Sequence, residues 1–379
     1  MKKQKKTDTS YRDRFRVLGG ILLAALCCQF LAVKIDQMAA RSGGAVRSGG
    51  AAWQEETGKQ QAYGAQEKTE AIEVSANGNF IKWVEFHVTC EAMAAAYELD
   101  TATYQEENPL NWIELLAYSG AKHGGSFGKD SVREIRKAAE AIRSGETTME
   151  ELTKDMEYYP YYLEAYSAVL GGMVGEFSME GESGAKNYYG LKAFSPIARG
   201  FDYSHYDDFG SSRSYGYARP HLGHDMMGMV GTPIIAIESG YVEALGWNQY
   251  GGWRIGIRSF DHKRYYYYAH LRQNYPYAEG LEEGSIVTAG DVIGYMGHTG
   301  YSTKENVNNI ETVHLHWGLQ LIFDESQKES DNEIWIDCYE LTKFLYRNRS
   351  EVQKIGDTRE WKRVYGMTDP AVEKALREK

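Results

Sequence analysis

Residues 231–247 read GTPIIAIESGYVEALGW, in which short β-branched runs are separated by Gly. Four more runs of this kind follow it: WRIGIRSF (253–260), RYYYYAHL (264–271), SIVTAGDVIGYMG (285–297) and HLHWGLQLIF (314–323). β-branched and aromatic residues favour strands, and Gly favours the turns between them. Residues 190–334 are therefore predicted to form a mainly β domain, built as a small antiparallel sheet or sandwich.

Residues 80–178 differ, because their apolar residues recur every three or four positions, as on one face of a helix. Within residues 80–104 this face collects five side chains: Trp83, Phe86, Cys90, Met93 and Tyr97. Further helices are predicted over residues 109–118, 131–142 and 160–170. Capping boxes are expected at two pairs, Ser131 with Glu134 and Thr148 with Glu151. An α-helical domain is therefore predicted to precede the β domain.

The beginning of the chain has the charge pattern of a membrane-targeted protein. Residues 1–16 hold seven Lys or Arg and two Asp, a net charge of +5, whereas the whole chain of 379 residues has a net charge of -11. Residues 17–33 (VLGGILLAALCCQFLAV) contain no charge and approach the length of a membrane span. We expect a cytoplasmic segment at 1–16, a transmembrane anchor at 17–34 and an exported body. A cleaved signal peptide and a lipoprotein are the alternatives.

The segments outside the two domains are predicted to be a linker and an extension. Residues 35–79 are rich in Gly, Ala, Gln and Glu and contain RSGGA twice, which is typical of a flexible linker. Residues 335–379 are predicted to be a helical extension, with a helix at 335–346 and a peripheral charged tail. The acidic balance makes a nucleic acid a poor candidate partner. Cys90 and Cys338 either pair or stay buried as thiols, and the sequence does not decide between these states.

Three short segments of the β region carry histidines in a pattern that suits a metal ion. HLGHD (221–225) places His221 and Asp225 on either side of a Gly that permits a tight turn. HLH (314–316) places His314 and His316 on one face of a strand, because side chains alternate between the faces. The third segment, YAHL (268–271), contributes His270 at the end of an aromatic strand.

This set of residue types fits a catalytic zinc ion, which takes three His or carboxylate ligands and keeps a position for water. Two imidazoles and one carboxylate leave such a site with residual positive charge, which polarises the water and a substrate carbonyl. Two further histidines can then take a proton, hydrogen-bond an oxyanion or protonate a leaving amine. Any one histidine on a strand is more simply explained as a hydrogen-bonded polar residue, but this explanation is harder to extend to all five residues.

The same segments, taken in order with V-x-AGDVIGYMGHTGYST (287–303), resemble the lysostaphin-like or LytM-type zinc metallopeptidases over about residues 195–323. The resemblance implies His221, Asp225 and His316 as ligands of one zinc ion, with His270 and His314 as the catalytic pair. It also implies a peptide groove across the sheet. The implied activity is hydrolysis of peptide bonds in peptidoglycan stem peptides or cross-bridges by zinc-bound water.

One loop departs from the family pattern. Residues 304–313 (KENVNNIETV) intervene before HLH, where the family usually has Gly or Pro, and are expected to border the groove. Other polar residues near the motifs are expected to lie outside the chemistry. They are His224 at a variable position, His298 at the rim, His205 and His262 on the surface, and Asp207 and Asp208 as solvated loop acids.

The leading hypothesis is a membrane-tethered zinc endopeptidase of a Gram-positive cell envelope, acting on peptidoglycan peptides. His314 is the expected general base and His270 the stabiliser or proton donor, although these roles could be exchanged. The alternative is a non-catalytic cell-envelope or sporulation protein that binds a protein partner through a peptidase-like domain. Degenerate members of that kind lose zinc ligands, whereas this sequence retains all three and both histidines, which favours an enzyme.

The role of the predicted helical domain stays open. A spacer, a regulator and a wall-binding domain all fit its composition. A muramidase would need a positioned acidic pair, and no two of its glutamates stand out as acid and nucleophile: Glu85, Glu91, Glu98 and Glu114.

Overall fold

The computed structural model describes residues 80–181, 184–214, 218–328 and 332–378. The predicted cytoplasmic segment, anchor and linker lie outside these residues. Among the residues that are described, no helix has the length and apolar character needed to cross a membrane. The described residues belong to one compact unit, Ile72–Lys379.

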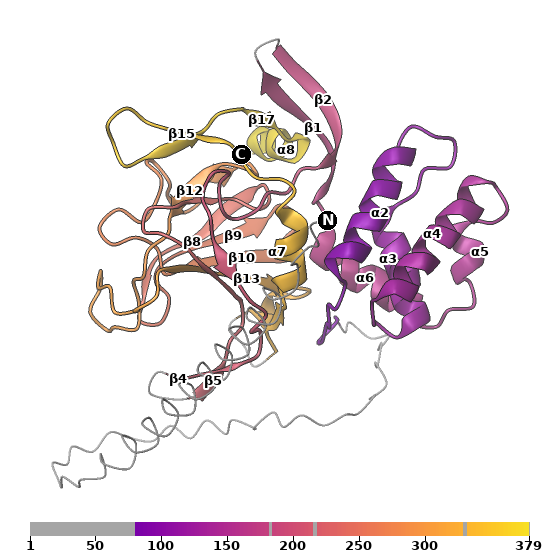
Figure 1. Cartoon of the computed structure of the whole chain (residues 1–379), viewed down its shortest axis with the longest axis horizontal. Helices are drawn as coiled ribbons and strands as arrows, with labels where there is room; N and C mark the ends of the chain where they lie inside the picture. The colour runs from indigo at the N-terminus through magenta and orange to yellow at the C-terminus, as the bar shows by residue number, and fades with distance from the viewer. Residues whose placement is uncertain (1–79, 182–183, 215–217, 329–331, 379) are drawn as a thin grey trace, which may run out of the picture. The chain divides into compact units, whose positions relative to one another are not determined.

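Five helices follow one another in the first part of this unit (Figure 1). They are α2 (Cys90–Thr103), α3 (Trp112–His123), α4 (Lys129–Arg143), α5 (Met149–Thr153) and α6 (Tyr159–Leu170). Thr148 caps α5 by accepting a hydrogen bond from the backbone N of Glu151 at 3.1 Å, which is one half of the predicted capping box, whereas the Glu151 carboxylate accepts from the Thr147 hydroxyl at 3.2 Å. The prediction for α4 was wrong in detail, because Ser131 lies inside the helix and its Oγ accepts from the backbone N of Gly128 at 3.1 Å.

The predicted helix over residues 80–104 is also too long at its start. Residues 80–89 are not helical, and α2 begins only at Cys90. In this segment Val84, Phe86 and Val88 are buried in alternation with exposed neighbours, which is the period of an extended chain. Trp83, expected on the apolar helix face, is 62% exposed. The apolar residues that recur every three or four positions therefore belong to two elements, an extended segment and a helix.

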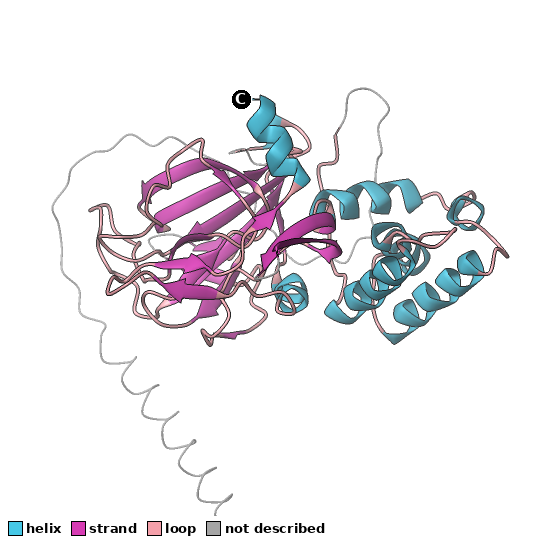
Figure 2. Ribbon diagram, turned by 90° about the horizontal axis from the view of Figure 1, so that it is seen from above, coloured by secondary structure: helices cyan, strands magenta, loops and turns pink. Residues whose placement is uncertain are grey.

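The β region is an antiparallel sheet, which confirms the predicted mainly β architecture (Figure 2). Its strands run in the spatial order β11-β8-β9-β10-β13-β6-β3, and β14 pairs with part of β13. The strands are β3 (Ser204–His205), β6 (His224–Met227), β8 (Gly240–Asn248), β9 (Gly252–Ser259), β10 (Arg264–Ala269), β11 (Ile286–Val287), β13 (His314–Leu321) and β14 (Ile334–Ile336). Buried aromatic and β-branched residues of the central strands form its core, including Ile255, Tyr266, Tyr268 and Trp317.

Shorter pairs surround this sheet. They are β4 (Ser212–Ser214) with β5 (Ala218–Pro220), β7 (Pro233–Ile235) with β12 (Val292–Tyr295), and β15 (Val352–Lys354) with β16 (Trp361–Arg363). A hairpin of β1 (Val174–Gly181) and β2 (Gly184–Leu191) lies between the helices and the sheet in sequence, and β17 (Met367–Thr368) pairs with β1. The helical region therefore ends before residue 178.

The C-terminal region is a helical extension only in part. It contains α7 (Tyr339–Leu345) and α8 (Pro370–Glu378), but residues 334–336 form β14 and the tail holds three more strands. The tail is not peripheral, because Met367 is buried and pairs with Met179. Cys338 is buried and Cys90 partly buried, and both are free thiols.

The helices and the sheet share one apolar core through α7. Phe344 of α7 stacks on Trp112 of α3 with ring centroids 5.7 Å apart, and meets Tyr97 of α2 edge-on at 5.8 Å. On its other side, Thr342 accepts a hydrogen bond from the indole N of Trp317 at 3.2 Å. Because these contacts are buried, the helical region packs as part of the body.

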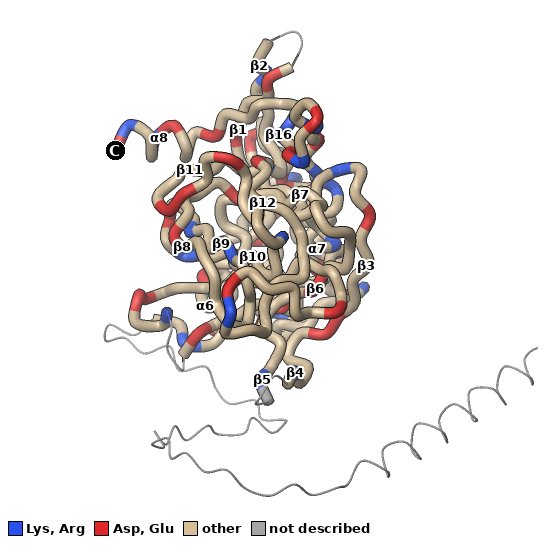
Figure 3. Tube along the Cα trace, turned by 90° about the vertical axis from the view of Figure 1, so that its left-hand side faces the viewer, with Lys and Arg blue, Asp and Glu red and all other residues tan. Residues whose placement is uncertain are grey.

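Charged residues are distributed over many segments of the described chain rather than gathered on one (Figure 3). Acidic residues appear on the hairpin, around β8 and β11 and on the loops near β6 (Figure 3).

One buried ion pair ties α6 to the sheet. The guanidinium of Arg264 in β10 contacts Glu238 Oε2 at 2.7 Å and Oε1 at 3.0 Å, and donates to the carbonyl of Ala168 at 2.9 Å. The Arg264 side chain is only 1% exposed. A buried carboxylate that loses its cation becomes strongly destabilising.

We expect Arg264→Ala to lower the free energy of unfolding by about 3–5 kcal/mol, because Glu238 would be left buried without its partner. Urea unfolding followed by circular dichroism measures this change. Arg133→Ala is the matched control, since the Arg133–Asp130 pair is about three-quarters exposed on both sides and should contribute less than about 1 kcal/mol. Equal losses of unfolding free energy in the two variants would contradict the stabilising role assigned to the buried Arg264–Glu238 ion pair.

Candidate metal centre

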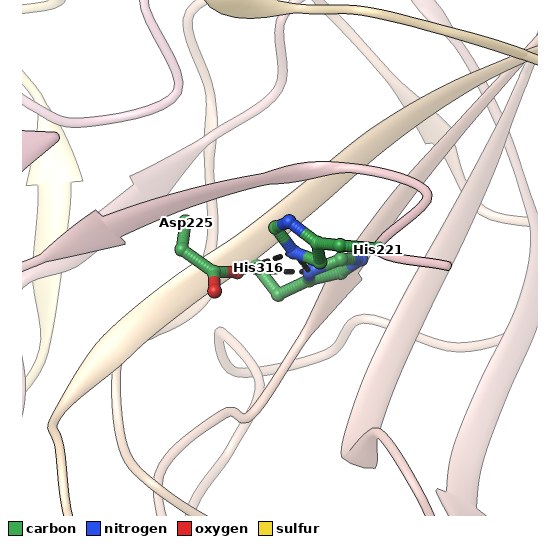
Figure 4. Close-up of side chains that lie close together, drawn as sticks. All are labelled: His221, Asp225 and His316. Carbon is green, nitrogen blue, oxygen red and sulfur yellow. Dashed lines mark hydrogen bonds and ion pairs between the residues drawn. The ribbon is translucent and has the colours of Figure 1, made fainter. Parts of the chain in front are cut away.

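The three predicted metal ligands converge on one point at the sheet. Asp225 in β6 and His316 in β13 lie directly opposite each other in the antiparallel pair, which puts both side chains on the same face. His221 follows β5 and precedes β6 in the chain. The side chains of all three residues point toward one another (Figure 4).

The distances between the three ligand atoms suit a small cation. His221 Nε2 lies 3.1 Å from Asp225 Oδ1 and 3.0 Å from His316 Nδ1, and His316 Nδ1 lies 2.9 Å from the same Asp225 oxygen. A tetrahedral zinc ion with bonds of about 2.0–2.1 Å separates its ligand atoms by about 3.3 Å. Three acceptor atoms this close repel one another unless a proton or a cation lies between them, so the residues fit a zinc ion.

Gly223 allows the His316 ring to reach this point. A Cβ at residue 223 would lie 2.5 Å from His316 Nε2 and 2.9 Å from the carbonyl oxygen of Trp317. The backbone of Gly223 does not have a positive φ, so the tight turn expected from the sequence is not the reason for the Gly. The reason is space for the edge of the His316 ring that faces away from the ligand atoms.

The protonation states at the centre are those that bind a metal. Burial alone would raise the pKa of Asp225, but the imidazoles of His221 and His316 beside it hold that pKa well below its usual range. Burial lowers the pKa of His316. The centre therefore presents an ionised carboxylate and a neutral imidazole at neutral pH, as metal binding requires.

His270 and His314 flank the centre with their rings 4.7 Å apart. His270 follows β10 with a φ of 62°, and His314 is the first residue of β13. Their Nδ1 atoms face backbone carbonyls, that of Thr299 at 3.0 Å and that of Thr312 at 2.9 Å. Since a carbonyl only accepts, each neutral ring carries its proton on Nδ1 and keeps Nε2 as an acceptor.

The two rings differ in their electrostatic surroundings. His314 Nε2 lies 3.7 Å from Asp225 Oδ1, so its protonated form has a carboxylate beside it. Burial, with His314 and His316 nearby, holds the pKa of His270 well below its usual range. His314 is therefore the ring whose protonated form a neighbouring carboxylate stabilises, whereas burial keeps the His270 ring neutral.

The remaining histidines lie away from the ligand atoms. His224 is buried, and its Nε2 lies 2.8 Å from Nδ1 of His205, which is partly buried rather than a surface residue as predicted. Burial, with His205 beside it, lowers the pKa of His224 to about 3. His298 Nδ1 donates to the carbonyl of Ile310 at 2.6 Å, and His262 lies in an exposed turn as expected.

The loop that departs from the family pattern is tied to neighbouring turns. Asn306 Oδ1 accepts from the indole N of Trp253 at 2.9 Å and from the backbone N of Asn274 at 2.8 Å. The carbonyl of Asn306 accepts from the side-chain amide of Gln273 at 2.6 Å. The loop is thus held beside the turn that follows His270.

Asp208 and Arg213 are the residues at the centre that sequence reasoning missed. Asp208 was expected to be solvated, but its side chain is 7% exposed and its Oδ1 lies 3.2 Å from His221 Nδ1. Arg213 contacts both Asp208 and Asp225. No local sequence pattern identifies these two residues, because they reach His221 only when β4 pairs with β5.

Comparison with known proteins places the centre in a family. Residues 219–331 match the model of peptidase family M23, and this stretch contains all three ligand residues and both flanking histidines. The chain carries a peptidase family M23 domain. The resemblance that the sequence motifs predicted is confirmed.

Curated relatives of the M23 domain are named endopeptidases. The L-Ala–D-Glu endopeptidase of Bacillus subtilis is 36% identical over 148 residues, which are 39% of this chain and 44% of that protein. Lysostaphin of Staphylococcus simulans is 37% identical over 89 residues, 23% of this chain and 17% of that protein. The chain thus spans less than half the length of the curated relatives it matches.

Solved structures are similar over different shares of the chain. The catalytic domain of lysostaphin from Staphylococcus simulans is 30% identical, with a TM-score of 0.29, and the similarity covers 37% of this chain and 92% of that domain. A LytM-type protein from Ruminococcus gnavus is 25% identical, with a TM-score of 0.47, over 70% of this chain and 90% of that one.

Proposed function

We propose that this protein is a zinc-dependent endopeptidase that hydrolyses peptide bonds in peptidoglycan stem peptides or cross-bridges. The observation that carries the proposal is the convergence of His221 Nε2, His316 Nδ1 and Asp225 Oδ1 within 3.1 Å of one another, beside two more histidines. The M23 domain and the endopeptidase names of its relatives support the hydrolase class. The name of the Bacillus subtilis relative also supports a peptide that contains a D-amino acid as substrate.

A bound zinc ion would supply a Lewis acid that polarises a substrate carbonyl and lowers the pKa of water. His221, Asp225 and His316 would hold it, and their single carboxylate would leave the site cationic. The protein's own part begins at His314, whose Nε2 takes the proton of the attacking water. The carboxylate of Asp225, 3.7 Å away, stabilises the imidazolium that results.

The proton then leaves His314 for the amine nitrogen of the departing peptide as the C–N bond breaks, so the ring returns to its neutral form. His270 enters as a hydrogen-bond acceptor, because its Nδ1 proton is held by the Thr299 carbonyl. It would orient the water or a substrate N–H through Nε2. The oxyanion role considered for His270 would need a protonated ring, which its burial opposes.

A cavity of about 480 Å³ lies beside the residues that follow His270 and would be a place for a peptide, although neither His270 nor His314 lines it. Gly297 lines it, and the backbone of Gly297 accepts from His314 N at 3.2 Å and donates to the carbonyl of His270 at 3.0 Å. The rest of the lining is formed by Val230, residues 272–275, His298, Asn308 and residues 358–360. The side-chain amides of Gln273, Asn274 and Asn308 bond to one another or to Asn306, so a peptide backbone would have to share or replace these bonds.

The proposal is tested by the zinc content of the purified full chain and by the release of new amino termini from purified peptidoglycan. We expect about one zinc ion per chain, and cleavage that is lost in His221→Ala together with the metal. Zinc without cleavage would contradict the catalytic proposal. Neither zinc nor cleavage would favour the alternative, an interaction protein of the cell envelope, and its protein partner would then be sought.

We also propose that residues 17–34 anchor the chain in the cell membrane with its body outside the cytoplasm. The uncharged stretch after a basic segment is the observation that supports it. Retention of the full chain in the membrane pellet after alkaline extraction, and digestion of its body by protease added to intact protoplasts, are the expected results. Release of the chain by alkali would contradict an anchor.

A further inference from the structure

The carboxylate of Asp208 lies behind the His221 ring, on the side away from the ligand atoms. Asp208 Oδ1 is 3.2 Å from His221 Nδ1, and the Asp208 carbonyl oxygen is 3.4 Å from the same nitrogen. This Oδ1 is buried and has no hydrogen-bond partner within the described part of the chain, so its contact with His221 Nδ1 is one of distance and charge, whereas the Asp208 carbonyl oxygen is the hydrogen-bond partner of that nitrogen. Both oxygens are acceptors, so Nδ1 carries the proton and Nε2 offers its lone pair to the ligand point.

Arg213 connects this carboxylate to the ligand carboxylate. Its guanidinium pairs with Asp208 Oδ2 and lies 3.3 Å from Asp225 Oδ2. The other oxygen of Asp225, Oδ1, is the one that meets His221 and His316. By occupying the Oδ2 side, Arg213 determines which oxygen of Asp225 is turned toward the ligand point.

The backbone holds these residues in place against His221. The N of Gly210 donates to the carbonyl of His221 at 2.8 Å, and the N of His221 donates to the carbonyl of Ser211 at 2.9 Å. Arg213 pairs across the β4–β5 ladder with Arg219. Asp208 and Arg213 both precede residues 219–331, the stretch that matches the family model.

We propose that Asp208 and Arg213 are positioning residues of the metal centre. Asp208 fixes the tautomer and ring plane of His221, and Arg213 restrains the carboxylates of Asp208 and Asp225 together. The inference rests on the proposed zinc function of the centre. Carboxylates that hold the far nitrogen of a metal-bound histidine usually contribute 10–100-fold in metal affinity.

The test measures zinc affinity in the full chain by competition with a chelator of known affinity. We expect Asp208→Ala to weaken zinc binding by about 10–100-fold and Arg213→Met by about 10-fold or more. Asp208→Asn should be weakened less than Asp208→Ala, because its amide oxygen still accepts from Nδ1. Asp207→Ala is the matched control, since the neighbouring Asp207 is exposed, and should bind zinc like the parent.

Two further readouts separate positioning from general structure. The thermal midpoint of the chelator-treated protein should stay near the parent value in Asp208→Asn, whereas Arg213→Met should lower it, because Asp208 and Asp225 lose a shared cation. The visible spectrum of the Co²⁺-loaded form, which depends on ligand geometry, should change in Asp208→Ala but not in Asp207→Ala. If Asp208→Ala does not fold, the zinc affinities of Asp208→Asn and Arg213→Met, each compared with the parent, still test the proposal.

Zinc affinity within twofold of the parent in both Asp208→Asn and Arg213→Met would overturn the proposal. Weaker zinc binding that only follows an equal loss of stability in the metal-free protein would overturn it too. A parent chain that binds no zinc would instead overturn the proposed function on which the inference rests. A parent that binds zinc without cleaving peptidoglycan leaves these affinity measurements fully interpretable.

Discussion

Replacement of His314 by alanine is expected to lower kcat on peptidoglycan by about 10²–10⁴-fold, the usual contribution of a general base. Zinc content should remain at the parent level, because the ligand atoms belong to His221, Asp225 and His316. The expectation follows from the position of His314 Nε2, which lies beside the Asp225 carboxylate and carries no proton in the neutral ring. Apart from the three ligand residues, no other described side chain combines these two properties at the centre.

Steady-state release of amino termini, with zinc measured on the same samples, checks this expectation. His87→Ala is the control, since His87 is exposed and lies outside the peptidase domain. Full hydrolysis by His314→Ala would show that another group takes the proton. In that case His270→Ala becomes the informative variant, because His270 Nε2 is the remaining acceptor beside the centre.

Gly223→Ala is expected to weaken zinc binding by about 10–100-fold, although residue 223 provides no ligand. The added Cβ would lie 2.5 Å from His316 Nε2 and 2.9 Å from the Trp317 carbonyl oxygen. The carbonyl belongs to β13 and is held by the sheet, so the His316 ring must move away from the ligand point. Overpacking of this kind also costs about 1–3 kcal/mol of stability.

Competition with a chelator and urea unfolding of the metal-free form measure the two effects separately. Gly175→Ala is the control, because a Cβ there would meet only the Lys192 side chain at 3.6 Å, an ordinary contact. Zinc affinity in Gly223→Ala equal to that of Gly175→Ala would mean that the ring tolerates the methyl group. The close approach would then not be what requires a Gly at residue 223.

The sequence predicts the position of a residue of the metal centre well when that position depends on a single strand. The alternation of a strand puts His314 and His316 on one face, and the structure places both beside Asp225. The pairing of β6 with β13, by contrast, depends on contacts across the sheet, and only the family resemblance indicated which residues meet. Asp208 shows the limit, since a loop acid becomes buried only when the chain folds back onto His221.

Fold prediction failed where two periodicities meet or where a long-range partner decides. Residues 80–89 contain apolar residues that satisfy both a helical and an alternating spacing, and burial of Val84, Phe86 and Val88 selects the extended form. The charged C-terminal tail was predicted to be peripheral, because its few apolar residues follow neither a helical nor a strand spacing. Its strand β17 forms only because the edge of β1 is available to pair with it.

That pairing has a consequence for the order in which the body is completed. A polypeptide is synthesised from its N-terminus, so the residues of the β1–β2 hairpin are made well before its third strand, in which Met367 pairs with Met179. The side chain of Asn348 donates to the carbonyls of Leu191 and Ala193, and these bonds likewise form only after residue 348 has been synthesised. Every ligand residue is made before these contacts can form. The last stretch of the chain therefore completes a body whose candidate metal ligands have already been synthesised, and a nascent or truncated body would expose the hairpin edge to other chains.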